Sequence, residues 1–200
     1  MVFLENVGRR SRVDAGEFSF WVELGDKSLN GNEANRLFRN EGDGRFRDVA
    51  WVAGAARRED ARSVVATDVD ADGDLDLVVQ NFEDEVRLLV NEGPCGHFLS
   101  VRLRGTASGR QAIGARVELT AGGRTQTREV RTTAGYLSGV SLACHFGLGA
   151  ATRVERLVVH WPSGARTVLE DLPADRHLVV TEDGEVLPGP DVSSARPGQG

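Results

Sequence analysis

Five aspartates crowd one short stretch of the chain, ATDVDADGDLDLVV, which spans residues 66–79. They are Asp68, Asp70, Asp72, Asp74 and Asp76. Two carboxylates about 4 Å apart repel each other by roughly 1 kcal/mol in water and by about 4 kcal/mol at an effective dielectric constant near 20. Such crowding requires a counter-charge, which a hard divalent cation with oxygen ligands supplies. The stretch therefore predicts a metal-binding turn.

The type and spacing of these ligands favour Ca²⁺. Ca²⁺ accepts about six to eight oxygen ligands in flexible geometry, whereas Mg²⁺ requires a tighter octahedron and keeps its waters. The pattern Asp-x-Asp-x-Asp-Gly matches the first half of an EF-hand loop, but the twelfth position is Val79 where an EF-hand has glutamate. We expect four aspartates to bind the ion through their carboxylates: Asp68, Asp70, Asp72 and Asp76. We expect Asp74 to bind through its backbone carbonyl.

The alternative is that aspartate and glycine occur here only because turns favour them. Ordinary turns use one or two such residues, and residues 59–92 carry eleven acidic side chains against two arginines. This excess favours the metal-binding interpretation over the turn interpretation.

Apolar and polar residues alternate along much of the chain, as they do in β-strands. In HFLSVRLR at 97–104, for example, Leu99, Val101 and Leu103 fall on one face. Glycine, which is common in the tight turns between strands, makes up 24 of 200 residues against a usual share of about 7%. This pattern predicts a mainly β fold with stacked or closed sheets and one short helical turn at 55–62. The expected strands are 17–24, 36–39, 62–67, 75–80, 86–91, 97–104, 115–121, 125–131, 154–160, 166–170 and 177–181.

An internal repeat divides the first half of the chain. RLFRNEGDGRF at 36–46 matches RLLVNEGPCGHF at 87–98, and FSFWVELGD ending at Asp26 resembles ARSVVATD ending at Asp68. The first copy lacks the aspartate-rich turn. We therefore expect one complete hairpin unit and one shortened unit.

Composition excludes some functions. A net charge of −6 and a pI near 5.3 argue against nucleic acid, which requires a basic face. No apolar run approaches the length of a membrane span, and the first residues do not resemble a signal peptide. Cys95 and Cys144 fit no zinc or redox spacing, which leaves free thiols or a disulfide.

Catalytic groups are sparse in the sequence. The four histidines, His97, His145, His160 and His177, have no spacing typical of a preformed metal site, and strand alternation places Cys144 and His145 on opposite faces. Ser138 lacks the Gly-x-Ser-x-Gly context of a nucleophile elbow. Two interpretations are open for three further residues, which either line a ligand groove or lie on an ordinary exposed sheet face: Tyr136, Arg116 and Arg128.

Two known families share motifs with this chain. VVATDVDADGDLDLVV followed by RLLVNEG resembles an FG-GAP or VCBS repeat, the calcium-binding β unit of integrin-type propellers. Residues 94–182 resemble the ASPIC/UnbV domain of the cartilage acidic protein family, with AIGARV, REV, GYLS, HFGLG and WPSG in the same order. The resemblance implies a partial propeller-like β unit in 1–93 and an antiparallel β-sandwich in 94–187. The polar residues 188–200 are expected to form a disordered tail.

The resemblance also implies a function. It points to a calcium-binding, non-catalytic module for binding or adhesion, whose partner is a protein, a glycan or a small molecule. The alternative is an enzyme or accessory protein of small-molecule biosynthesis of the enediyne type. An open sheet edge makes a homo-oligomer conceivable. The family points to an extracellular or periplasmic location, whereas the missing signal peptide points inside the cell or to part of a longer product.

Overall fold

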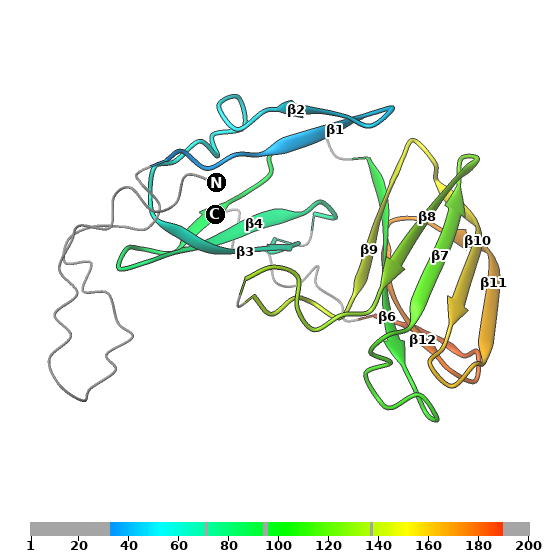
Figure 1. Cartoon of the computed structure of the whole chain (residues 1–200). Helices are drawn as coiled ribbons and strands as arrows, with labels where there is room; N and C mark the ends of the chain where they lie inside the picture. Colours follow the sequence, from blue (N-terminus) through cyan, green and yellow to red (C-terminus); the bar gives the residue numbers. More distant parts are fainter. Residues whose placement is uncertain (1–32, 71, 94–95, 137, 190–200) are drawn as a thin grey trace, which may run out of the picture.

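The computed structural model describes residues 33–70, 72–93, 96–136 and 138–189, in which thirteen β-strands and no helix occur (Figure 1). The predicted mainly β fold is therefore confirmed. The expected strand at 17–24 lies outside the described residues. The prediction of a helical turn at 55–62 is wrong, because residues 55–58 are irregular and the next strand begins at Ala61. The carbonyl of Arg57 accepts a hydrogen bond from the backbone N–H of Asn35 (2.7 Å), so it does not serve a helix.

The first five strands form a hairpin and a small sheet. Strands β1 (Phe38–Gly42) and β2 (Arg45–Asp48) pair in antiparallel fashion. A separate three-stranded antiparallel sheet has the order β3-β4-β5. Its strands are β3 (Ala61–Thr67), β4 (Asp76–Asn81) and β5 (Arg87–Leu89). The acidic turn connects β3 to β4, so the predicted strands on both of its flanks are confirmed.

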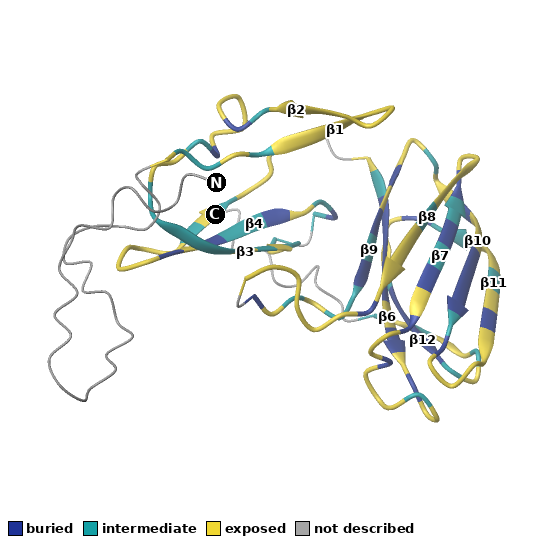
Figure 2. Cartoon of the chain, in the orientation of Figure 1, coloured by how far each residue is buried: buried dark blue, intermediate teal, exposed yellow. Residues whose placement is uncertain are grey.

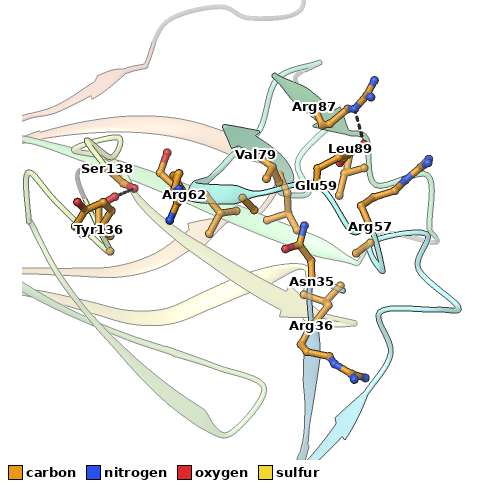
Figure 3. Close-up of a pocket in the computed structure, with 17 residues that line it drawn as sticks. Asn35, Arg36, Arg57, Glu59, Arg62, Val79, Arg87, Leu89, Tyr136 and Ser138 are labelled. Carbon is orange, nitrogen blue, oxygen red and sulfur yellow. Dashed lines mark hydrogen bonds and ion pairs between the residues drawn. The ribbon is translucent and has the colours of Figure 1, made fainter. Parts of the chain in front are cut away.

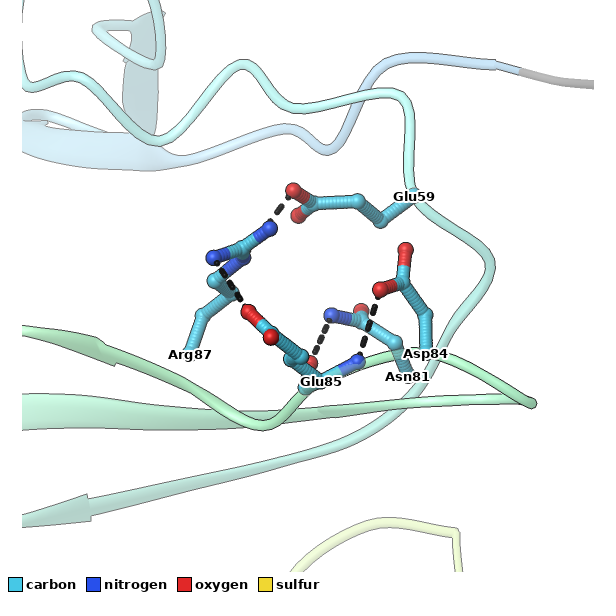
Figure 4. A network of polar contacts seen from close by, with 5 residues as sticks. All are labelled: Glu59, Asn81, Asp84, Glu85 and Arg87. Atoms are coloured by element: carbon cyan, nitrogen blue, oxygen red, sulfur yellow. Dashed lines mark hydrogen bonds and ion pairs between the residues drawn. The ribbon is translucent and has the colours of Figure 1, made fainter.

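A polar network holds the β4–β5 connection against the segment before β3 (Figure 4). The guanidinium of Arg87 contacts Glu59 at 3.1 Å and Glu85 at 3.2 Å. The side-chain amide of Asn81 donates to the carbonyl of Glu85 at 2.7 Å, and the N–H of Glu85 donates to Asp84 at 2.7 Å. These contacts anchor the end of the sheet opposite the acidic turn.

The C-terminal strands form two four-stranded sheets. Their orders are β11-β10-β7-β8 and β13-β12-β6-β9. The strands are β6 (His97–Arg104), β7 (Arg116–Ala121), β8 (Arg124–Glu129), β9 (Cys144–Gly149), β10 (Arg153–His160), β11 (Arg166–Pro173), β12 (Arg176–Thr181) and β13 (Val186–Pro188). One pair differs from the expected antiparallel arrangement, because β6 and β12 are parallel. No short hairpin joins these two strands, so chain connectivity does not force them to be antiparallel.

Alternate residues of the two sheets build one core between them, as in a β-sandwich. Buried residues from both sheets include Leu99, Val117, Phe146, Leu157 and Val180. Cys144 belongs to this core and His145 does not, as the strand alternation predicted. Figure 2 shows burial concentrated in the sandwich, whereas β1 and β2 are exposed throughout. The sandwich is therefore the packed body beside which the acidic turn is placed.

Candidate metal centre

The acidic turn is shaped by hydrogen bonds from its own backbone to its own aspartates. The N–H of Asp72 donates to Asp70 at 3.3 Å, that of Asp74 to Asp72 at 3.0 Å, and that of Gly73 to Asp68 at 3.1 Å. Short aspartate side chains suit such bonds, which compete with regular secondary structure and favour turns. The carboxylates are thus drawn to the inside of the turn.

Three of the five predicted ligands converge. Carboxylate oxygens of Asp68, Asp70 and Asp76 all lie within 4.8 Å of one another. Asp72 and Asp74 are not part of this group of three, so their predicted metal contacts remain predictions. Oxygens at this spacing can share one cation, and carboxylate oxygen is the donor that Ca²⁺ prefers.

Asp76 has a structural role besides its place in this group. It is only 1% exposed, and its two oxygens accept the N–H groups of Val69 (2.8 Å) and Asn91 (2.9 Å). It therefore ties the start of the turn to the segment that follows β5. The sequence carried no local signal for the contact with Asn91, which is 15 positions away.

Asp74 lacks the compensation that the other aspartates have. Both of its carboxylate oxygens are buried without a hydrogen-bond partner among the described residues. Burial raises the pKa of its carboxyl group, and the neighbouring charges of Asp72, Asp76, Asp70 and Asp68 raise it further. A buried carboxylate without a partner is unfavourable, so a cation close to Asp74 would stabilise the turn.

The turn packs on the outer face of the sandwich. Gly73 has φ of +97°, and a Cβ atom added there would lie 2.3 Å from the ring of Phe98 in β6. Only glycine fits this position, both for its backbone conformation and for its space. Phe98 also stacks on His145 and meets His177 edge-on, with ring centroids 5.8 and 5.4 Å apart. The loop pattern in the sequence accounts for a glycine at this position, but it did not predict the contact with Phe98.

The remaining titratable candidates take structural positions. His97 contacts Asp175 at 2.7 Å, and His160 lies 3.4 Å from Glu118. Burial raises the pKa of the Cys144 thiol to about 11, which keeps it protonated and unreactive at neutral pH. Cys144 forms no disulfide within the described residues, and Cys95 lies outside them, so whether the two cysteines are free or paired stays open as the sequence left it.

Two cavities open on one face of the β3-β4-β5 sheet, because Val64 and Leu77 line both. The smaller, of about 350 Å³, includes Tyr136 (Figure 3). The larger, of about 600 Å³, includes His145 and Arg128. Of the three groove candidates, Tyr136 lines the smaller cavity, Arg128 lines the larger one, and Arg116 lines neither.

Comparison with known families agrees with the motifs. The family model described as ASPIC and UnbV matches residues 105–186, and the model of an FG-GAP-like repeat matches residues 20–79. The acidic turn lies inside the second match. No curated protein matches the chain. In the part of the chain that the structure describes, no helix has the length and apolar character that a membrane crossing requires.

Proposed function

We propose that this chain, in which an FG-GAP-like repeat precedes an ASPIC and UnbV region, is a non-catalytic β-protein that binds Ca²⁺ and serves as a binding or adhesion module. The observation that carries the proposal is the convergence of Asp68, Asp70 and Asp76 within 4.8 Å. In the proposed site Asp72 adds a fourth carboxylate and Asp74 its backbone carbonyl.

Electrostatics supports a bound cation. The carboxylates repel one another at this spacing, and the unpartnered oxygens of Asp74 add a desolvation cost. A divalent ion offsets the repulsion between the carboxylates, and its nearby charge also stabilises the buried Asp74 carboxylate. All the available ligands are oxygens, which favours Ca²⁺ over softer transition metals.

The N-terminal strands support a role in binding. These strands and the loops beside them expose several large apolar side chains: Phe38, Phe46, Trp51, Val52, Phe82, Val86, Leu88 and Val90. Large exposed apolar patches mark contacts with other molecules. We propose that the β3-β4-β5 sheet is one unit of a propeller-like arrangement, and that its partner is a protein, a glycan, a small molecule or a second copy paired at an open edge.

Thermal unfolding with and without Ca²⁺ tests this function. A ligand that binds only the folded state at about 100 times its Kd stabilises that state by about 2.7 kcal/mol. We expect the melting temperature to rise by roughly 5–10 °C with Ca²⁺ and to return with a chelator. The matched control is Asp70→Ala/Asp72→Ala, which should show no shift. Equal melting temperatures of the unmodified protein in Ca²⁺ and in chelator contradict the proposal.

The alternative of a role in small-molecule biosynthesis depends on a pocket that gathers Tyr136, His145 and an arginine. The larger cavity joins His145 to Arg102 and Arg128, but Tyr136 lines the smaller one. Arg116, the third groove candidate, contacts Glu118 at 3.0 Å. The grouping that favours the alternative is therefore not formed.

A further inference from the structure

The larger cavity has a polar row across its floor. Ser100 of β6 pairs with His145 of β9 on one side and with His177 of β12 on the other. Directly paired residues lie on the same face of a sheet, so these three side chains stand side by side. The neighbouring residues Leu99 and Val101 point into the sandwich core, which places the row on the outer face.

Two guanidinium groups supply positive charge to this cavity. Arg102 follows Ser100 by two residues and so shares its face of β6. Arg128 comes from β8 in the other sheet, and its guanidinium carbon lies 5.4 Å from the ring centroid of Phe146. Among the described residues, neither Arg102 nor Arg128 forms an ion pair.

The acidic side chains of the cavity are engaged elsewhere. Glu129 contacts Arg131 at 2.7 Å. Asp68 accepts the N–H of Gly73 and belongs to the group of converging carboxylates. Glu129 is therefore paired with a cation and Asp68 takes part in the acidic turn, which leaves Arg102 and Arg128 as the charged groups that a ligand anion can approach.

The opposite wall of the cavity is apolar. It is formed by Val64, Ala66, Leu75 and Leu77 from the acidic-turn sheet and its turn. A volume of about 600 Å³ falls within the range of small-molecule sites, which combine apolar walls with a few polar groups. The shape and composition fit a ligand with an apolar body and one charged end.

Two histidines, His145 and His177, complete the polar side of the cavity. Burial lowers the pKa of His145, and the charges of His177 and Arg128 lower it further, so its imidazole is neutral at pH 7. The Nε2 atom of His177 is buried and has no hydrogen-bond partner among the described residues. A ligand or water that completes the hydrogen bonding of such an atom removes the free-energy cost of burying it unpaired.

We propose that this interdomain cavity binds a small organic anion, a carboxylate or phosphate on an apolar body. Arg102 and Arg128 hold the anionic group, and the wall of Val64, Leu75 and Leu77 receives the apolar part. Arginine suits this role because its planar guanidinium can bind a carboxylate or phosphate through two hydrogen bonds. The side chains that hold the anion differ from the proposed metal ligands, although Asp68 lines this cavity as well as belonging to the metal group.

Calorimetric titration with octanoate tests the proposal on the full chain. Octanoate has both the charge and the apolar body, 1-octanol has only the body, and inorganic phosphate has only the charge. We expect octanoate to bind at least tenfold more tightly than either. The double variant Arg102→Gln/Arg128→Gln should weaken octanoate at least tenfold. The matched control Arg104→Gln/Arg124→Gln changes arginines of the same two strands that do not line the cavity, and should leave binding unchanged.

Terbium luminescence on the same variants separates this proposal from the metal site. Both double variants should retain terbium binding, which also shows that they are folded. Equal octanoate affinity in the two double variants overturns the assignment, as does octanol binding as tightly as octanoate. Failure of terbium binding in the unmodified protein would count against the calcium proposal alone.

Discussion

Replacing Asp76 by alanine is expected to abolish Ca²⁺ binding and also to destabilise the metal-free protein by about 1–3 kcal/mol. Asp76 is only 1% exposed, and its carboxylate accepts the backbone N–H groups of Val69 and Asn91. Alanine leaves both donors without their acceptor, and an unsatisfied buried donor costs about 1–3 kcal/mol. The metal site loses one of its three converging ligands at the same time.

Urea unfolding in the presence of a chelator measures the metal-free stability. The control is Asp70→Ala, which removes a ligand whose only hydrogen bond among the described residues is the long one from the N–H of Asp72, at 3.3 Å. It should lose Ca²⁺ binding while its metal-free stability changes by no more than about 0.5 kcal/mol. Equal stabilities of the two variants in chelator would show that Asp76 is not the structural anchor of the turn.

Phe146→Ala is expected to destabilise the sandwich by about 3–5 kcal/mol. Phe146 is fully buried and pairs across strands with Leu99, which is also fully buried. Truncating such a residue loses its transfer free energy and leaves a cavity. The loss is a large share of a domain stability of about 5–15 kcal/mol.

Denaturant unfolding followed by tryptophan fluorescence checks this value, because Trp161 is buried in the same core. Phe46→Ala is the matched control, since Phe46 in β2 is 63% exposed, and it should change the free energy of unfolding by no more than about 0.5 kcal/mol. If the two variants differ by less than 1 kcal/mol, the sandwich core is not organised around Phe146.

The fold was predictable where apolar and polar residues alternate cleanly. The pattern of Leu99, Val101 and Leu103 predicted β6, and similar patterns predicted β3, β4, β7 and β10. The short strands β2 and β13 have too few residues to show a period. Strand β9 was missed because Gly147 and Gly149 occupy outward positions where polar side chains would mark the alternation.

The helical turn expected at 55–62 shows how tertiary contacts override local preference. Alanine and arginine favour helix in isolation. Two carbonyls of this segment instead accept hydrogen bonds from other parts of the chain, that of Arg57 from Asn35 and that of Asp60 from Phe82. A partner about 20 positions away leaves no mark on the local pattern.

The candidate metal site was predictable in type but not in detail. Spacing alone identified the turn and its five aspartates, but it did not distinguish the three that converge, Asp68, Asp70 and Asp76, from Asp72 and Asp74. The packing of Gly73 on Phe98 joins residues from two sheets, and the row of His145, Ser100 and His177 depends on a parallel strand pair. Register between distant strands is set by the packed fold, so no local spacing could predict either feature.

Titration of the metal-free protein with Ca²⁺ measures whether the acidic turn binds the ion. We expect one saturable site with a Kd in the micromolar to millimolar range, and loss of that site in Asp70→Ala/Asp72→Ala. A folded protein that releases no heat with Ca²⁺ and gives no terbium luminescence, or a variant that binds as tightly as the unmodified chain, would contradict this expectation.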